Sequence, residues 1–230
     1  MRNILAEKPS ADLHGRLKFS LDFVGNPDIK NKVVLDIGCG YGWCELNFIN
    51  RGVKKVYATE VSEDDLTTIK KNIHNKRVVF GVADAIKLPF SKNSLDTVVS
   101  WEVLEHIPEN TEEQMFAEVA RVLKPGGAFY LSTPFNSWPS KLFDPAWWLI
   151  KHRHYSLEDL RKLAKGAHLK VDKVFSKGGF WEILYSLNMY FSKWILRRKP
   201  LLQNFFNKNL DLEYKRGGLS TTYLKCTKIK

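Results

Sequence analysis

One stretch near the start of the chain decides the fold, and it reads Val34-Leu35-Asp36-Ile37-Gly38-Cys39-Gly40-Tyr41-Gly42. The apolar run from residue 32 to residue 37 is typical of a parallel strand that is buried on both faces. Residues 42–51 have the apolar pattern of a helix. Between the two, glycine at every second position lets the backbone approach a ligand closely, and the first turn of the helix offers unpaired N–H groups. The stretch therefore predicts a ligand-binding loop between a strand and a helix.

The chemistry of this loop differs from that of a dinucleotide-binding loop. The pattern G-x-G-x-x-G requires a third glycine at the position where Trp43 stands. The carboxylate of Asp36 would repel a pyrophosphate, but it would suit a ligand that carries an amino group or a positive charge. Both residues therefore argue against a nicotinamide-dependent oxidoreductase.

Outward from the loop, strand and helix patterns alternate up to residue 133. We expect strands at 32–37, 54–61, 77–83, 95–101 and 128–133, with helices at 42–51, 62–74 and 111–123 between them. Ser62, followed by Asp65 three residues later, predicts the start of a helix. This order of elements predicts a parallel sheet with helices on both faces, and such sheets bind ligands at the carboxyl ends of their strands.

The flanking segments complete this expectation. Apolar residues at helical spacing predict a helix within about the first 25 residues of the chain. After residue 133 we expect a helix at 156–166, begun by Ser156 and Asp159, a strand at 169–176 and a closing strand at 219–229.

Three successive strands of this pattern end in a carboxylate, namely Asp36, Glu60 and Asp84. A carboxylate at the end of the second strand can accept hydrogen bonds from both hydroxyls of a ribose. Asp84 is placed to meet an adenine amino group beside the small Ala85. The spacing thus predicts a nucleoside site at the edge of the sheet.

With these residues the sequence resembles the class I S-adenosylmethionine-dependent methyltransferases. Residues 34–42 are similar to the first motif of that family, Glu60 to its ribose-binding acid, and Asp84-Ala85 to the pair that contacts the adenine. Residues 95–101 resemble the fourth strand, and residues 121–132 resemble the helix, turn and strand around Leu-Lys-Pro-Gly-Gly. The resemblance covers about residues 30–135.

The resemblance implies a doubly wound, Rossmann-like α/β fold with a seven-stranded sheet in the order 3-2-1-4-5-7-6, an antiparallel last strand, and helices on both faces. It also implies S-adenosylmethionine as the methyl donor. The donor site expected on this basis comprises Asp36, Gly38, Cys39, Gly40, Gly42, Glu60, Val61, Asp84, Ala85 and Trp101.

A second motif follows the expected fourth strand, where Glu102, Glu105 and His106 share one face of a helical turn. With a further imidazole from His152 or His154 they could bind a divalent cation. The metal set that we expect is Glu102, Glu105, His106 and His154. The arrangement resembles the ubiquinone-biosynthesis O-methyltransferases and the small-RNA 3′-end 2′-O-methyltransferases, in the second of which such a set holds a metal beside the substrate hydroxyls.

Two alternatives to the metal site remain open. One is a metal-free general base, for which His154, Glu102 and His106 are the candidates. The other is that the motif has no direct catalytic role and only lines the pocket or orients a loop.

Charged residues are distributed unequally along the chain. Residues 1–150 hold 18 Lys+Arg and 19 Asp+Glu, a net charge of −1, whereas residues 151–230 hold 18 and 6, a net charge of +12. Such asymmetry favours an anionic partner, which could be a membrane surface, a nucleic acid or a phosphorylated substrate. The alternative is a solvated basic surface without a partner.

Two segments of the last hundred residues stand out as insertions. Residues 134–155 are rich in aromatic side chains and form a candidate lid or acceptor site: Trp138, Phe143, Trp147, Trp148 and Tyr155. Residues 179–217 are a candidate amphipathic insertion, with one apolar helical face next to basic residues: Phe180, Leu184, Leu187, Phe191, Trp194 and Ile195, followed by Arg197-Arg198-Lys199. This combination is typical of interfacial helices, although a helix packed on the core or on a second copy would also fit.

These observations lead to one expected function. We expect a single methyltransferase domain over residues 1–230 that methylates a hydroxyl on a hydrophobic small-molecule, lipid-linked or glycan-type acceptor. Three cysteines and no evident targeting or membrane-spanning segment favour the cytoplasm, with peripheral attachment to an anionic membrane. One alternative is an RNA methyltransferase, against which stands the lack of an Asn-Pro-Pro-Tyr-like motif. The other is a non-catalytic S-adenosylmethionine-binding partner protein, against which stands the intact glycine loop.

Overall fold

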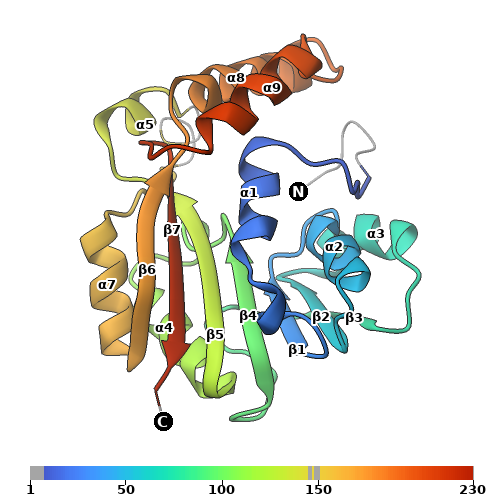
Figure 1. The fold of residues 1–230 in the computed structure, drawn as a ribbon, viewed down its shortest axis with the longest axis vertical. Helices are drawn as coiled ribbons and strands as arrows, with labels where there is room; N and C mark the ends of the chain where they lie inside the picture. Colours follow the sequence, from blue (N-terminus) through green and yellow to red (C-terminus); the bar gives the residue numbers. More distant parts are fainter. Residues whose placement is uncertain (1–7, 145–146, 148–150, 230) are drawn as a thin grey trace.

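A mixed sheet of seven strands forms the centre of the computed structural model, which describes residues 8–144, 147 and 151–229 (Figure 1). The strands lie in the order β3-β2-β1-β4-β5-β7-β6. The first five pair in parallel, and β7 runs antiparallel to both β5 and β6. The α/β fold, the strand order and the antiparallel last strand expected from the sequence are confirmed.

The elements follow the alternation predicted for the first part of the chain. The strands are β1 (Val33–Ile37), β2 (Lys55–Glu60), β3 (Val78–Val82), β4 (Leu95–Trp101), β5 (Leu123–Pro134), β6 (Leu169–Lys177) and β7 (Thr221–Lys228). The α-helices in the described part are α1 (Gly15–Phe23), α2 (Trp43–Asn50), α3 (Glu63–Asn72), α4 (Glu112–Val122), α5 (Trp138–Leu142), α7 (Leu157–Gly166), α8 (Phe180–Tyr190) and α9 (Gln203–Glu213). A short 3-10 turn, η1 (Asn26–Asp28), precedes β1, and a π-helical turn, η2 (Phe191–Ile195), continues α8.

The core lies on both faces of the sheet because successive strand residues point to opposite sides. Val34 of β1 and Val99 of β4 pack in one buried cluster with residues of α1 and α2. Leu35 and Val98, their neighbours in sequence, pack in another with residues of α4 and α7. This double burial explains why the sequences of β1 and β4 read as nearly continuous apolar runs.

Side-chain caps fix the start of two helices where the sequence predicts them. The Ser62 hydroxyl accepts a hydrogen bond from Asp65 N at 3.3 Å, at the start of α3. At α7, Ser156 Oγ accepts from Asp159 N at 3.1 Å and Asp159 Oδ2 accepts from Ser156 N at 2.8 Å, which is a complete capping box. Both predicted helix starts are confirmed.

Two boundaries and one helix differ from the expectation. α1 begins only at Gly15, because Asp211 of α9 accepts the Gly15 N–H at 2.8 Å and so caps the helix from a distant part of the chain. β5 begins at Leu123 rather than at residue 128, because Leu123 pairs with Leu95 before a bulge in the ladder. α9 was not expected as a separate helix.

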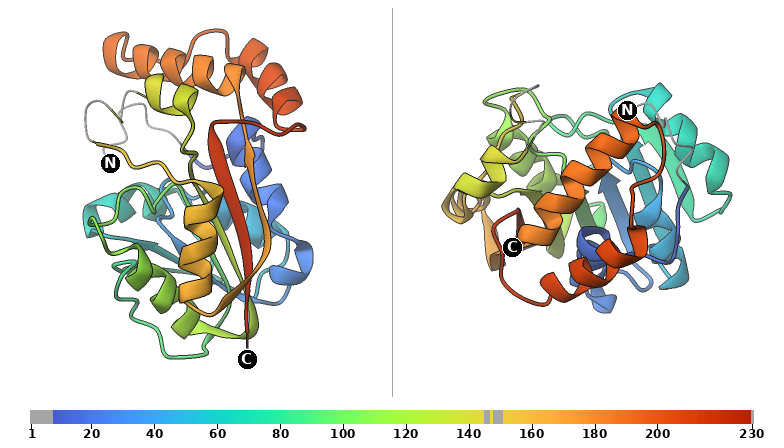
Figure 2. Two further views of the ribbon diagram at one scale, coloured as in Figure 1. Left: turned by 90° about the vertical axis from the view of Figure 1, so that its left-hand side faces the viewer. Right: turned by 90° about the horizontal axis from the view of Figure 1, so that it is seen from above.

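The helices α5, α8 and α9 form a layer beyond the carboxyl ends of β4 and β5, at the top of Figure 1, with α8 crossing over the sheet in the view from above (Figure 2). This layer corresponds to the two segments predicted as insertions. Within the described residues, none of the helices has the length and apolar character needed to cross a membrane.

Candidate functional site

The glycine loop joins the end of β1 to the start of α2 at the carboxyl edge of the sheet. The backbone φ is 77° at Gly38 and 53° at Gly40, a conformation that favours glycine. A Cβ atom at Gly38 would lie 2.4 Å from Val103 Cγ2, whereas a Cβ at Gly40 would meet nothing within 4 Å. Gly38 therefore allows close packing, while Gly40 borders open space in which a ligand can approach the backbone.

Glu60, at the end of β2, is tied to this loop. Its Oε1 accepts a hydrogen bond from Gly40 N at 2.7 Å. The side chain of the next residue, Val61, is 67% exposed although it is apolar. After β3, Asp84 accepts a hydrogen bond from Ile86 N at 3.1 Å, beside the buried Ala85. The arrangement fits a nucleoside, because it offers a carboxylate for hydroxyls and an uncovered apolar side chain for a base.

Two buried carboxyls lie behind the loop, on Asp36 of β1 and Glu45 of α2. Burial, helped by the negative charge of Glu60, raises the pKa of Asp36 to about 7. Burial also raises the pKa of Glu45 well above its ordinary value, and the negative charge of Asp36 adds to this effect. A cationic group bound nearby would stabilise the ionised form of the pair.

The turn after β4 begins with Glu102, which has a positive φ of 56°, an uncommon conformation for a residue other than glycine. Glu102 Oε1 accepts a hydrogen bond from Ser132 Oγ at 2.6 Å, and Oε2 accepts one from Arg16 Nη1 at 2.7 Å. Arg16 of α1 also lies 3.7 Å from the buried Glu182 of α8. One guanidinium thus joins α1, the turn and α8.

Two residues of the same turn, Glu105 and His106, form a cluster with His152 from the segment before α7. His106 Nε2 lies 3.3 Å from His152 Nε2, which in turn lies 3.7 Å from Oε1 of Glu105. Glu105 is buried; its Oε2 accepts from Thr133 Oγ1 at 2.9 Å, and its Oε1 has no hydrogen-bond partner within the described part of the chain. Burial raises the pKa of Glu105 well above the ordinary value. The pKa of His106, whose side chain is exposed on one side, is lowered by partial desolvation and by the nearby His152.

The spacing of this cluster suits a metal ion. Glu105, His106 and His152 each offer one ligand atom, and these atoms all lie within 4.8 Å of one another. Two nitrogen ligands of a tetrahedral ion, each about 2.0–2.1 Å from it, are about 3.3 Å apart. The distance between the two Nε2 atoms matches this value.

The structure groups the residues of the second motif differently from the expected metal set. Glu102 points to Arg16 and Ser132. His154 is buried, with Nε2 3.0 Å from Asp144 Oδ2 and Nδ1 3.1 Å from Phe135 O. The described residues converge in two groups that share His152: Glu105, His106 and His152 form one, and Asp144, His152 and His154 form the other.

Sequence reasoning missed three side chains near this cluster: Arg16, Asp144 and Tyr190. Burial raises the pKa of Tyr190, the negative charge of Asp144 also raises it, and the positive charge of Arg16 lowers it, so Tyr190 lies within electrostatic reach of both charges. No short motif marks them, since they come from three distant segments that only the fold brings together. Trp148, which was expected in the lid, falls outside the described residues.

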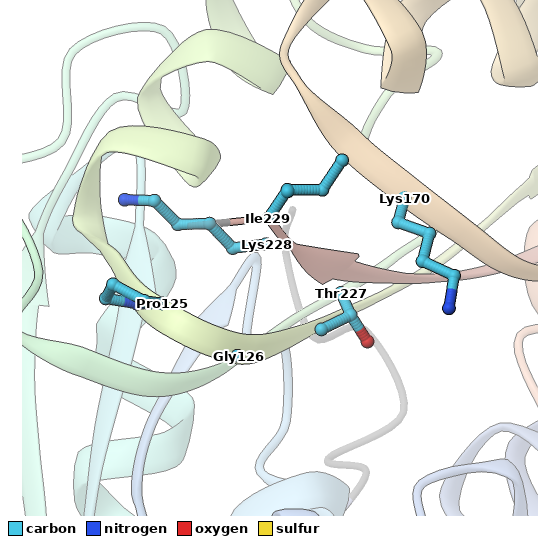
Figure 3. A pocket seen from close by; sticks show the side chains of 6 residues that line it. All are labelled: Pro125, Gly126, Lys170, Thr227, Lys228 and Ile229. Carbon is cyan, nitrogen blue, oxygen red and sulfur yellow. The ribbon is translucent and has the colours of Figure 1, made fainter.

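A pocket of about 330 Å³ lies elsewhere, at the opposite end of the sheet (Figure 3). It is lined by residues at the start of β5 and β6 and at the end of β7: Pro125, Gly126, Lys170, Thr227, Lys228 and Ile229. Because the glycine loop lies at the carboxyl ends of the parallel strands, this pocket is separate from the candidate site.

Comparison with known proteins gives a family match for the central part of the chain. Residues 34–127 match a family model described as a methyltransferase domain. Methyltransferase GfsG of Streptomyces halstedii is 34% identical over 98 residues, which is 41% of this chain and 34% of that protein. The ubiquinone biosynthesis O-methyltransferase of Neisseria meningitidis is 27% identical over 165 residues, covering 68% of each chain. The chain spans about a third of the length of several other curated relatives as well.

Solved structures agree on the fold. A geranyl diphosphate methyltransferase in complex with S-adenosylmethionine superposes with a TM-score of 0.65 at 18% sequence identity. The match covers 93% of this chain and 84% of that one. It extends the similarity of fold well beyond residues 34–127.

Proposed function

We propose that this chain, which carries a class I S-adenosylmethionine-dependent methyltransferase domain, transfers a methyl group from that donor to a hydroxyl of a hydrophobic acceptor. The observation that carries the proposal is the hydrogen bond from Gly40 N to Glu60 at the carboxyl edge of the sheet, next to the open space that borders Gly40.

On the donor side, each residue has a role that its position supports. Glu60 would accept hydrogen bonds from the ribose hydroxyls, Val61 would cover one face of the adenine, and Asp84 would meet its amino group. The Asp36–Glu45 pair would favour the cationic methionine end. The remaining proposed donor-site residues shape the loop and the pocket wall: Gly38, Cys39, Gly42, Ala85 and Trp101. When bound, the donor supplies an electrophilic methyl group on a sulfonium.

On the acceptor side, we take His106 as the general base among the three candidates. His106 is exposed, whereas Glu102 is bound by Arg16 and Ser132, and His154 is buried against Asp144. Holding the acceptor hydroxyl in line with the methyl group supplies most of the rate enhancement. A positioned base adds about 10²–10⁴-fold.

A divalent cation held by Glu105, His106 and His152 is a second candidate for activating the hydroxyl. It is favoured by the buried Glu105 Oε1, which has no hydrogen-bond partner in the part of the chain described, and by the spacing of the two Nε2 atoms. An ion at this place would act as a Lewis acid that lowers the pKa of a bound hydroxyl.

The nature of the acceptor is supported by similarity and by composition. The Neisseria relative is named for O-methylation in ubiquinone biosynthesis, and its match covers about two thirds of both chains. Exposed aromatic and aliphatic side chains surround the upper layer of the molecule, among them Trp138 and Phe143 of the segment 134–155. We therefore propose a lipid-linked or glycan-type acceptor and a protein that works at a membrane surface.

The test is a transfer assay with donor labelled in its methyl group. A prenylated catechol should accept label, and the same compound with both hydroxyls already methylated should not. Label that enters RNA instead would contradict the proposed acceptor, and tight donor binding with no transfer to any acceptor would favour a non-catalytic binding protein.

The assay also separates the two ways of activating the hydroxyl. Metal dependence predicts that a chelator abolishes transfer, that Mg²⁺, Mn²⁺ or Zn²⁺ restores it, and that His152→Ala acts as strongly as His106→Ala. A metal-free base predicts full activity in chelator and a strong effect of His106→Ala alone. His74→Ala, which changes an exposed histidine at the far end of α3, is the matched control.

A further inference from the structure

The helix α8 and the turn η2 present an apolar face to solvent. Its members recur at a spacing of three or four residues, as along one side of a helix: Phe180, Leu184, Leu187, Phe191, Trp194 and Ile195. Phe180 is 66% exposed, Trp194 57% and Ile195 69%, whereas Glu182 and Ser192 on the other side are buried. We call these six residues the outer face of α8. Contiguous exposed apolar surface of this kind marks an interaction site.

The charges around the outer face are of one sign. Between residues 180 and 216 every exposed charged side chain is basic: Arg197, Arg198, Lys199, Lys208, Lys215 and Arg216. The acidic residues of the same segment are buried or partly buried, and each has a partner within the fold. Glu182 is buried 3.7 Å from Arg16, and Asp211 accepts from Gly15 N. Glu213 accepts from the backbone N–H groups of Trp181 and Glu182, both at 2.9 Å.

The contacts of these acids leave the basic side chains as the most exposed charges of the segment. The carboxylates of Asp211 and Glu213 cap helices, and that of Glu182 pairs with Arg16. Residues 180–216 hold seven Lys+Arg and three Asp+Glu, so they contribute +4 of the net charge of +12 that residues 151–230 carry, and the exposed charges among them are all basic.

We propose that the outer face of α8, with the basic residues that follow it, docks on an anionic lipid bilayer. Aromatic and aliphatic side chains gain free energy by leaving water for the acyl boundary, and adjacent Lys and Arg gain from anionic headgroups. A nucleic acid would use the charges, but it offers no apolar medium for a row of Leu, Phe and Ile side chains.

The opposite side of α8 faces the candidate site. Tyr190 and Glu182 lie near Arg16, which reaches Glu102 in the turn after β4. Docking would thus place α8 between the bilayer and the acceptor side of the site. Delivery of a lipid-linked acceptor rests on the proposed function, whereas docking itself does not, so binding is measured without donor.

The experiment is co-sedimentation of the full chain with two kinds of vesicle. One is pure phosphatidylcholine, and the other contains phosphatidylglycerol as a quarter of its lipid. The protein should bind the anionic vesicles more tightly, and added salt should weaken this binding while leaving an apolar remainder. Each basic residue near the surface contributes about fivefold to the partition coefficient, which corresponds to about 1 kcal/mol. Replacing Arg197, Arg198 and Lys199 together with Gln should therefore lower binding at least tenfold.

A matched variant controls for net charge. Replacing Lys54, Lys71 and Lys76 with Gln removes the same three charges from exposed positions near β2, α3 and β3, and takes the net charge from +11 to +8 in the same way. This control should keep its binding. The double variant Phe191→Ser, Trp194→Ser should lose the part of vesicle binding that salt does not weaken. Ile229→Ser, which changes a side chain of similar exposure elsewhere, should keep it.

Three results would overturn the proposal. The first is a wild-type protein that stays in the supernatant with anionic vesicles. The second is an equal loss of vesicle binding in the variant that lacks Arg197, Arg198 and Lys199 and in its lysine control. Binding to a short RNA that needs the three basic residues but not Phe191 and Trp194 would assign the surface to nucleic acid. Circular dichroism of every variant shows whether a loss reflects unfolding, and methyl transfer to a water-soluble acceptor reports the proposed function separately.

Discussion

Glu60 is the residue on which the donor assignment depends most. Its carboxylate is held by Gly40 N and stands where the ribose hydroxyls of a bound nucleoside would lie. Replacing Glu60 with Ala should weaken the binding of S-adenosylmethionine by about 1.5–3 kcal/mol, the value for losing hydrogen bonds to a charged acceptor. Isothermal titration calorimetry measures this directly. Glu63→Ala, an exposed acid three residues later, is the matched control, and equal affinity in the Glu60→Ala and Glu63→Ala proteins would disprove the ribose contact.

Asp36 gives a second prediction at this scale, through pH. Its pKa rises from an ordinary 3.8 to about 7 on folding because the carboxyl is buried, and the pKa of Glu45 shifts the same way. Between these pH values the folded state holds a proton that the unfolded state has lost, so the free energy of unfolding should fall as pH rises from about 4 to about 7.

Urea unfolding at a series of pH values tests this linkage. Asp36→Asn and Glu45→Gln each remove one titrating carboxyl, so the decline with pH should be smaller in both variants than in the wild type. A decline of the same size in all three proteins would show that other groups cause it.

At the scale of elements, Arg16 is the link between α1, the turn after β4 and α8. Replacing it with Ala would leave Glu102 and the buried Glu182 without their cation. The Arg16 side chain is 38% exposed, so the cost should fall between that of an exposed pair, about 0–1 kcal/mol, and that of a buried pair, about 3–5 kcal/mol. We expect about 2 kcal/mol of lost unfolding free energy by chemical denaturation.

Lys18 offers the comparison for this prediction, because it lies on the same helix and pairs with Asp22 at the surface. Lys18→Ala should cost no more than about 0.5 kcal/mol. If both variants lose the same stability, the Arg16 link contributes no more than an ordinary surface pair.

At the scale of the whole molecule, local sequence signals account for most strands and helices of the sheet region. The apolar strands, the Ser62 and Ser156 caps and the glycine loop each act within a few residues, so periodicity and capping rules found them. The carboxylate series Asp36, Glu60 and Asp84 could also be predicted, because parallel strands bring their carboxyl ends to one edge.

The remainder depends on contacts between distant segments, which no local pattern encodes. α9 is positioned by Asp211 and Glu213, which cap α1 and α8 respectively. The acceptor side joins Arg16 from α1, Tyr190 from α8 and His152 from the segment before α7. For the same reason the expected metal set included Glu102 and His154, whereas the structure brings His152 to Glu105 and His106.

The central claim is that S-adenosylmethionine binds at the carboxyl edge formed by β1, β2 and β3. A crystal structure of the protein with S-adenosylhomocysteine, the demethylated donor, tests it most directly. The account predicts ribose hydroxyls within hydrogen-bond distance of Glu60, adenine against Val61 and Ala85, and the sulfur directed toward the turn that carries Glu102 and His106. Density for the ligand at any other place, with Glu60 and the glycine loop left uncovered, would contradict it.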